Sequence, residues 1–191
     1  LDGQANVNSF SVSKGSQITR METHCFFAAP DAQAAMSAVY LGRDNQHHDI
    51  TTVVSHEYAD CKSRQLIRGV LDDKARGVFQ GRVRVAPDAQ KTDGQQMSRA
   101  LLLSRDAEAD AKPELEIFAD DVVCSHGATV GELDETLLFY LKSRGIDEAE
   151  ARTMLIDAFL VDTLEEISYQ PFADFLRGQV SGWTARQTGV E

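Results

Sequence analysis

The segment from Asp120 to Gly127 holds the densest group of side chains that could do chemistry. Within it, Cys124 and His126 stand two residues apart. If Val122 to His126 forms a strand, the two side chains project from the same face, which brings a thiolate and an imidazole close together. Both groups are ligands for iron, zinc or copper. Two ligands do not complete a tetrahedral site, so a metal would need further donors from this chain or another. A buried thiol beside a hydrogen-bonded histidine is the structural alternative.

Two enzymatic interpretations apply to the same segment. A cysteine activated by a histidine could act as a nucleophile, but the signatures of cysteine hydrolases and a third, orienting residue are missing from this stretch. The adjacent carboxylates Asp120 and Asp121 could instead serve as an acid and base pair in a carbohydrate-active enzyme. Neighbouring residues of a strand point to opposite faces, so this pair requires a turn that reorients them.

A second polar cluster contains His47, His48 and His56, with Cys61 close behind. A loop with solvated histidines is the expected setting for this cluster. The sequence has neither a GxGxxG motif after a strand nor a GxxxxGK[ST] motif, so a standard phosphate loop is not expected. Any use of ATP is therefore expected to belong to a partner.

The cysteines indicate a reducing environment. Cys25, Cys61 and Cys124 make an odd set without a C-x-x-C motif, which argues against both a disulfide framework and a self-contained zinc module. Reduced thiols in the cytoplasm fit this usage best. His24 precedes Cys25, and a core role for one of these two residues is favoured over metal ligation.

The first two thirds of the chain read as short strands. From Val7 to about Gly131, apolar runs are separated by Gly, Pro, Asp and Asn, without a sustained helical period. Within the run from Val78 to Val85, alternation predicts one buried face and one solvated face that carries Arg82 and Arg84. The runs show no fixed spacing, so a sandwich, a barrel and a solenoid of stacked coils all remain open.

Helical periodicity follows in the last third. A first helix is predicted from Glu132 to Ser143, and a second begins with Asp147 as its N-cap. The second helix has a wide apolar surface, which is typical of a helix with contacts on two sides. A third helix is predicted to start at Pro171. Past Gly178 the tail is expected to be loose.

Composition excludes two classes of partner. The 191 residues include 30 acidic and 19 basic side chains, which gives a formal net charge of −11. Such a charge repels phosphate backbones, so nucleic acid is not an expected partner. The longest stretches without a formal charge are too short to span a membrane, so no membrane segment is expected.

Several ordered motifs lie between about Asp49 and Ile167. They are Ser63 to Gln65, Phe79 to Gly81, Ala86 to Gln96, Leu101 to Ser104, Lys112 to Val122, Cys124 to Thr129, Leu138 to Leu141 and Ser143 to Ile146. Together they resemble the SufB/SufD family of iron-sulfur cluster assembly proteins, and the resemblance is weak at both ends of the chain. Within the family, the Cys-Ser-His-Gly-Ala-Thr motif is similar to the SufD sequence at this place, whereas the SufB sequence is more acidic there.

The resemblance implies a mainly β fold. Residues 1–131 would form part of a right-handed parallel β-helix, and residues 132–191 a small α-helical domain that docks an ATPase. Members of the SufD branch are longer than 191 residues, so the chain is expected to correspond to the C-terminal part of such a protein. The β-helix is one of the architectures that the strand pattern left open.

The resemblance also implies a non-enzymatic scaffold. In the family, SufD pairs with SufB through the β-helices, the SufC ATPase binds the C-terminal helices, and a nascent iron-sulfur cluster forms at the SufB-SufD interface; a flavin can take part. The family histidine at that interface falls on His126. His126 and Cys124 are accordingly the candidate cluster or iron ligands, completed by the partner, and His56 ranks third. A structural role at the interface is the alternative for all three, and a homodimer without SufB is a further hypothesis.

Overall fold

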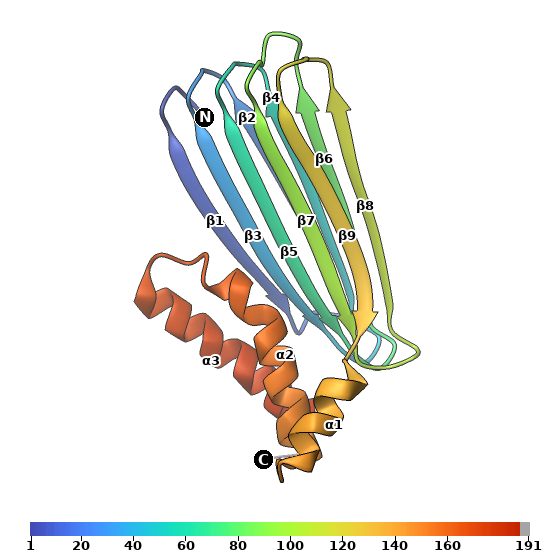
Figure 1. Ribbon diagram of the computed structural model, residues 1–191. Coiled ribbons are helices and arrows are strands. Elements are labelled where there is room, and N and C mark those ends of the chain that lie inside the picture. Colours follow the sequence, from blue (N-terminus) through green and yellow to red (C-terminus); the bar gives the residue numbers. More distant parts are fainter. Residues whose placement is uncertain (188–191) are drawn as a thin grey trace.

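The computed structural model describes residues 1–187 and shows a parallel β-helix followed by three helices (Figure 1). Two parallel sheets face each other, which confirms the predicted fold class. Sheet A has five strands in the order β1 (Asn6–Lys14), β3 (Gln33–Gly42), β5 (Lys62–Leu71), β7 (Asp93–Leu102) and β9 (Val123–Glu132). Sheet B has four strands in the order β2 (Ile18–Phe27), β4 (His47–His56), β6 (Arg76–Val85) and β8 (Glu108–Ile117).

The coils repeat with a period that the apolar runs concealed. Strands β3, β5, β7 and β9 begin at residues 33, 62, 93 and 123, so one coil takes about 30 residues. Each coil contributes one strand to each sheet. The apolar runs in the sequence come from strands of both sheets, so their spacing does not show the period of about 30 residues. Asp31, Asp60 and Lys91 adopt positive φ at the equivalent turn of successive coils, two residues before β3, β5 and β7.

Two apolar clusters and a polar band between them fill the interior. One cluster is built around Phe27, Val54 and Val83, and the other around Tyr40 and Phe79. Because strand side chains alternate, each strand sends every second residue into this space. Arg82 and Arg84 lie on the outer face of sheet B, as predicted, where they pair with acidic residues.

The expectation of solvated histidines at positions 48 and 56 is wrong. Both side chains lie on β4 and are fully buried between the sheets. The His48 Nδ1 atom lies 2.7 Å from the Ser13 hydroxyl, and the His56 Nε2 atom lies 2.9 Å from the Ser63 hydroxyl. Burial lowers the pKa of each imidazole to about 4. Single serine partners from sheet A therefore hold two neutral histidines inside the β-helix.

This burial predicts a loss of stability in mild acid. The unfolded chain takes up a proton at each histidine below about pH 6.5, whereas the folded chain does so only near pH 4. The stabilisation is therefore complete above pH 6.5 and declines as pH falls towards 4. At about pH 5, each histidine should cost about 2 kcal/mol of unfolding free energy. Urea unfolding of the full-length protein at about pH 7.5 and 5 measures this. Equal midpoints would contradict it.

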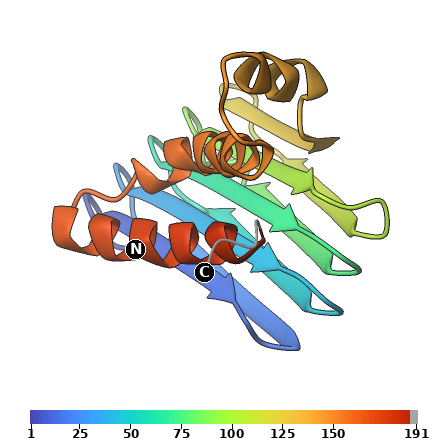
Figure 2. The same ribbon diagram turned by 90° about the horizontal axis from the view of Figure 1, so that it is seen from below.

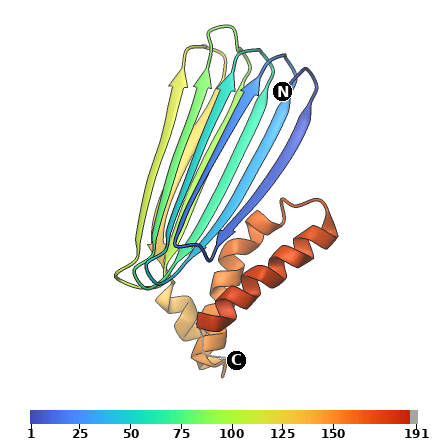
Figure 3. The same ribbon diagram turned by 180° about the vertical axis from the view of Figure 1, so that it is seen from behind.

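Three helices follow the β-helix: α1 (Glu135–Ser143), α2 (Glu148–Leu164) and α3 (Gln170–Gln187). Asp134 caps α1, and Asp147 caps α2 as predicted. Helices α2 and α3 lie over the outer face of sheet A (Figure 2). In residues 1–187, no helix covers the outer face of sheet B (Figure 3). The division of the chain into domains at residue 131 stays a prediction.

The segment after Gly178 is helical, so the expectation of a loose tail is wrong as far as Gln187. Trp183 is buried in an apolar cluster with Leu160 of α2 and Val39 and Val70 of sheet A. This long-range packing stabilises a helix whose local sequence gave only a weak signal; residues 188–191 lie outside the described part. None of the helices in residues 1–187 is long and apolar enough to cross a membrane.

Candidate functional site

The last coil of the β-helix ends in two edge strands, β8 and β9 (Figure 1). Each lies at the end of its sheet and, within residues 1–187, pairs on one side only. Unpaired backbone groups along such strands invite pairing with another chain. Large apolar side chains are exposed at the same end, namely Ile117, Phe118, Val123 and Val130. We call the end formed by β8 and β9 the open end.

Cys124 and His126 both lie on β9 at the open end, on the same face of the strand. Their register partners on β7 are Gly94 and Gln96. The Cys124 Sγ atom would lie 3.3 Å from a Cβ atom built on Gly94, which shows that Cys124 faces the interior. Because side chains alternate, His126 belongs to the same inward row. Cys124 is half-buried and His126 is exposed.

Cys124 and His126 differ in how readily they could bind a metal. Burial raises the pKa of the Cys124 thiol, the backbone of Gly94 lowers it, and the nearby Asp93 charge raises it further. Cys124 therefore stays protonated at neutral pH and must lose its proton before it can bind a metal. The His126 imidazole is exposed, so His126 is the more accessible donor.

Within residues 1–187, no group of three or more histidine, cysteine and acidic side chains is placed to hold a metal ion. Cys124 and His126 thus remain a pair, and any further donors would come from outside the described residues. The structure does not bring His56 to the open end. Its ring stacks on Phe27 inside the β-helix, with 4.4 Å between the ring centroids.

The other candidates are scattered. His47 is partly buried, His24 is exposed, and Cys25 packs against the apolar cluster around Phe27. Burial raises the pKa of Cys25 and of Cys61, so both are protonated thiols at neutral pH. Asp120 and Asp121, the carboxylates of the carbohydrate-enzyme hypothesis, are exposed in the bend that precedes β9.

Sequence reasoning missed a row of buried polar side chains that leads to His126. Gln65 and Gln96 face the interior at the register positions that precede His126 in sheet A, and Thr52 approaches them from sheet B. The sequence signal for this row is a glutamine at the same inward position of two neighbouring strands of sheet A, β5 and β7. Only the register reveals that the glutamines and the histidine belong to one row.

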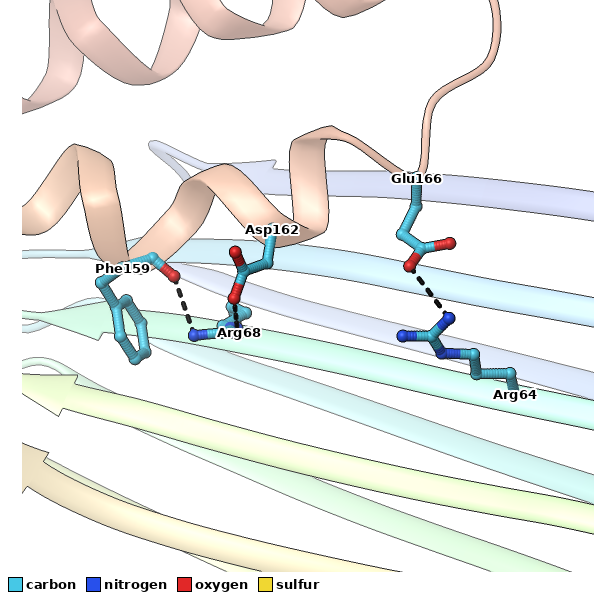
Figure 4. A network of polar contacts seen from close by, with 5 residues as sticks. All are labelled: Arg64, Arg68, Phe159, Asp162 and Glu166. Carbon is cyan, nitrogen blue, oxygen red and sulfur yellow. Dashed lines mark hydrogen bonds and ion pairs between the residues drawn. The ribbon is translucent and has the colours of Figure 1, made fainter.

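Helix α2 is held on sheet A by a charged anchor (Figure 4). Arg68 of β5 is buried and donates hydrogen bonds at 2.9 Å to the Phe159 carbonyl and to the Asp162 carboxylate. Arg64, which lies earlier on β5, forms a second ion pair at 3.3 Å with Glu166, which follows α2. A groove of about 700 Å³ lies beside these pairs on the outer face of sheet A. Its three arginines and three acidic residues balance in charge: Arg64, Arg68, Arg99, Asp162, Glu165 and Glu166.

The α-helical region exposes several large apolar side chains. Leu137, Phe139 and Tyr140 of α1 are each at least half exposed, and so are Tyr169 and Phe175. An exposed aromatic group of this kind on a helical surface is typical of a protein interface.

Comparison with known proteins gives one consistent result. Residues 1–159 match the family model described as "SUF system FeS cluster assembly, SufBD core domain". The chain is 40% identical to the iron-sulfur cluster assembly protein SufD of Escherichia coli over 167 residues, which cover 87% of this chain and 40% of that protein. It is 38% identical to SufD of Bacillus subtilis over 129 residues, covering 68% and 30% of the two chains.

A third relative extends the match to most of the chain. An iron-sulfur cluster assembly SufBD family protein of Synechocystis is 34% identical over 178 residues, which cover 93% of this chain and 39% of that protein. The chain therefore spans about two fifths of the length of the relatives from Escherichia coli and Synechocystis.

Proposed function

The chain belongs to the SufB/SufD family of iron-sulfur cluster assembly proteins, and from this premise we propose that it is part of the SufD-type scaffold subunit of a SufBCD complex. A role in iron-sulfur cluster assembly follows from the family. The finer proposal is that the subunit is not an enzyme, that it pairs with a SufB homologue, and that a SufC homologue hydrolyses the ATP. Its setting would be the cytoplasm, where the three thiols stay reduced.

The observation that carries the proposal is the position of His126. An exposed imidazole lies on an edge strand, in the inward row, with the Cys124 thiol two residues away. A partner that pairs with the open end would add its own side chains beside these two donors. A nascent cluster built there would receive the missing ligands from SufB, because two donors from this chain do not complete a site.

The open end also suits SufB pairing. The strands β8 and β9 offer unpaired backbone groups, and Ile117, Phe118 and Val123 offer apolar area. The second interface, for SufC, would use the exposed side chains of α1. Phe139 is the most exposed of these, at 73%.

Light scattering tests the assembly. The full-length protein, co-expressed with SufB and SufC homologues from the same source, should give the mass of one heterodimer with two ATPases. Phe139→Asp should reduce that mass by one ATPase, whereas Phe118→Asp should release SufB. A folded protein that elutes alone, or as a homodimer in the presence of SufB, would contradict the proposal. Polysaccharide cleavage by the purified protein would point to the carbohydrate-active alternative instead.

A further inference from the structure

A band of polar side chains crosses the otherwise apolar interior of the β-helix. Gln65 and Gln96 are 1% and 2% exposed, and Thr52 is 4% exposed. The Thr52 hydroxyl donates to Gln65 Oε1 at 2.5 Å, and Gln96 Nε2 donates to the same oxygen at 3.4 Å. The band therefore runs from sheet B to β5 and then to β7, one strand away from β9.

The band is incomplete at both amides. Within residues 1–187, the buried Oε1 atom of Gln96 has no hydrogen-bond donor and the buried Nε2 atom of Gln65 has no acceptor. An unsatisfied buried carbonyl costs about 1 to 3 kcal/mol. Space for this amide is nevertheless kept open, because a Cβ atom on Gly81 of sheet B would lie only 2.0 Å from Gln96 Nε2. The fold therefore accommodates the Gln96 side chain, although the Oε1 atom of this side chain accepts no hydrogen bond.

His126 is the next residue of the same row. It is the register partner of Gln96, and neighbouring strands lie about 4.8 Å apart. The two inward histidines of β4 show what such a residue does in this β-helix. His48 and His56 each place one ring nitrogen within hydrogen-bond distance of a side chain from sheet A, Ser13 or Ser63. For His126 the nearest buried polar side chain comes instead from its own sheet, where Gln96 is its register partner on β7.

We propose that Gln96 is a positioning residue for His126: its Oε1 atom accepts the N–H of one ring nitrogen, so that the other ring nitrogen is unprotonated and directed to the open end. This inference rests on the proposed function, in which His126 binds the nascent cluster. A hydrogen bond to one ring nitrogen fixes both the tautomer and the orientation of a metal-binding imidazole. It would also satisfy the orphaned oxygen.

The test compares three glutamine variants and His126→Ala of the full-length protein in the assembled complex, with cluster yield from ferrous iron and sulfide as the readout. Gln96→Leu removes the acceptor and should lower the yield about tenfold. Its urea midpoint should equal or exceed that of the wild type, because a buried unsatisfied atom is lost. Gln96→Glu keeps an acceptor at the same place and should restore most of the yield.

Gln65→Leu is the matched control. It removes an equally buried amide one strand farther from the open end. The unpartnered Nε2 atom of Gln65 is lost, but two buried donors, the Thr52 hydroxyl and Gln96 Nε2, lose their shared acceptor. Gln65→Leu should therefore lower stability and leave the yield unchanged. A purely structural role for Gln96 predicts that yield follows stability in all three variants.

His126→Ala distinguishes a failure of the positioning role of Gln96 from a failure of the proposed function. If His126→Ala loses the yield and Gln96→Leu retains it, the positioning role is wrong and the proposed function stands. If His126→Ala retains the yield, the ligand role proposed for His126 is itself wrong, and the positioning role falls with it. Loss in both variants, with rescue by Gln96→Glu, supports both.

Discussion

Replacing His126 with alanine is expected to leave the protein folded and to lower cluster formation in the assembled complex at least tenfold, on the order of the loss seen when groups around a metal are removed. The side chain is exposed on an edge strand, so its loss should change the unfolding free energy by no more than about 0.5 kcal/mol. The chemical loss should be large because Cys124 alone, with a raised pKa, is a poor substitute donor.

Ser125→Ala is the matched control for His126→Ala. Ser125 lies between the two donors, is also exposed, and belongs to the opposite face of β9. Its replacement should leave the cluster yield unchanged. The measurement is the absorbance of the cluster after anaerobic reconstitution of the complex, with light scattering to show that the complex still forms. A normal yield from a correctly assembled His126→Ala complex would refute the ligand role.

The strands and helix caps could be predicted because their signals are local. Alternation placed Arg82 outside and Val83 inside, and Asp147 was identified as a cap from its position before a helical pattern. The same-face arrangement of Cys124 and His126 also followed from strand alternation alone.

The features that escaped prediction depend on register between coils. The burial of His48 and His56 required serines that lie 35 and 7 residues away in the chain, and no local pattern announces them. The link between Gln96 and His126 likewise depends on which residues are neighbours in sheet A. The helical segment after Gly178, which contains Trp183, was not predicted, because it is stabilised by packing against strands more than a hundred residues earlier in the chain.

A second large effect is expected from Gly69→Ala in β5. A Cβ atom on Gly69 would lie 1.9 Å from Cζ and 2.2 Å from Cε2 of the Tyr40 ring, its register partner on β3. The ring cannot simply move away, because Tyr40 is 1% exposed and also occupies the space beside Gly77 of sheet B. Interiors packed this closely do not absorb an added methyl group cheaply. We expect a loss of about 3 kcal/mol or more of unfolding free energy.

Two comparisons test whether the Tyr40 ring causes the loss of stability in Gly69→Ala. Gly131→Ala on β9 adds the same methyl group where no atom lies within 4 Å, so it should change the urea midpoint little. Tyr40→Leu in the Gly69→Ala background should cost less than the sum of the two single changes, because the smaller side chain removes the clash. If Gly69→Ala unfolds at the same urea concentration as Gly131→Ala, the Tyr40 ring does not fill the space beside Gly69.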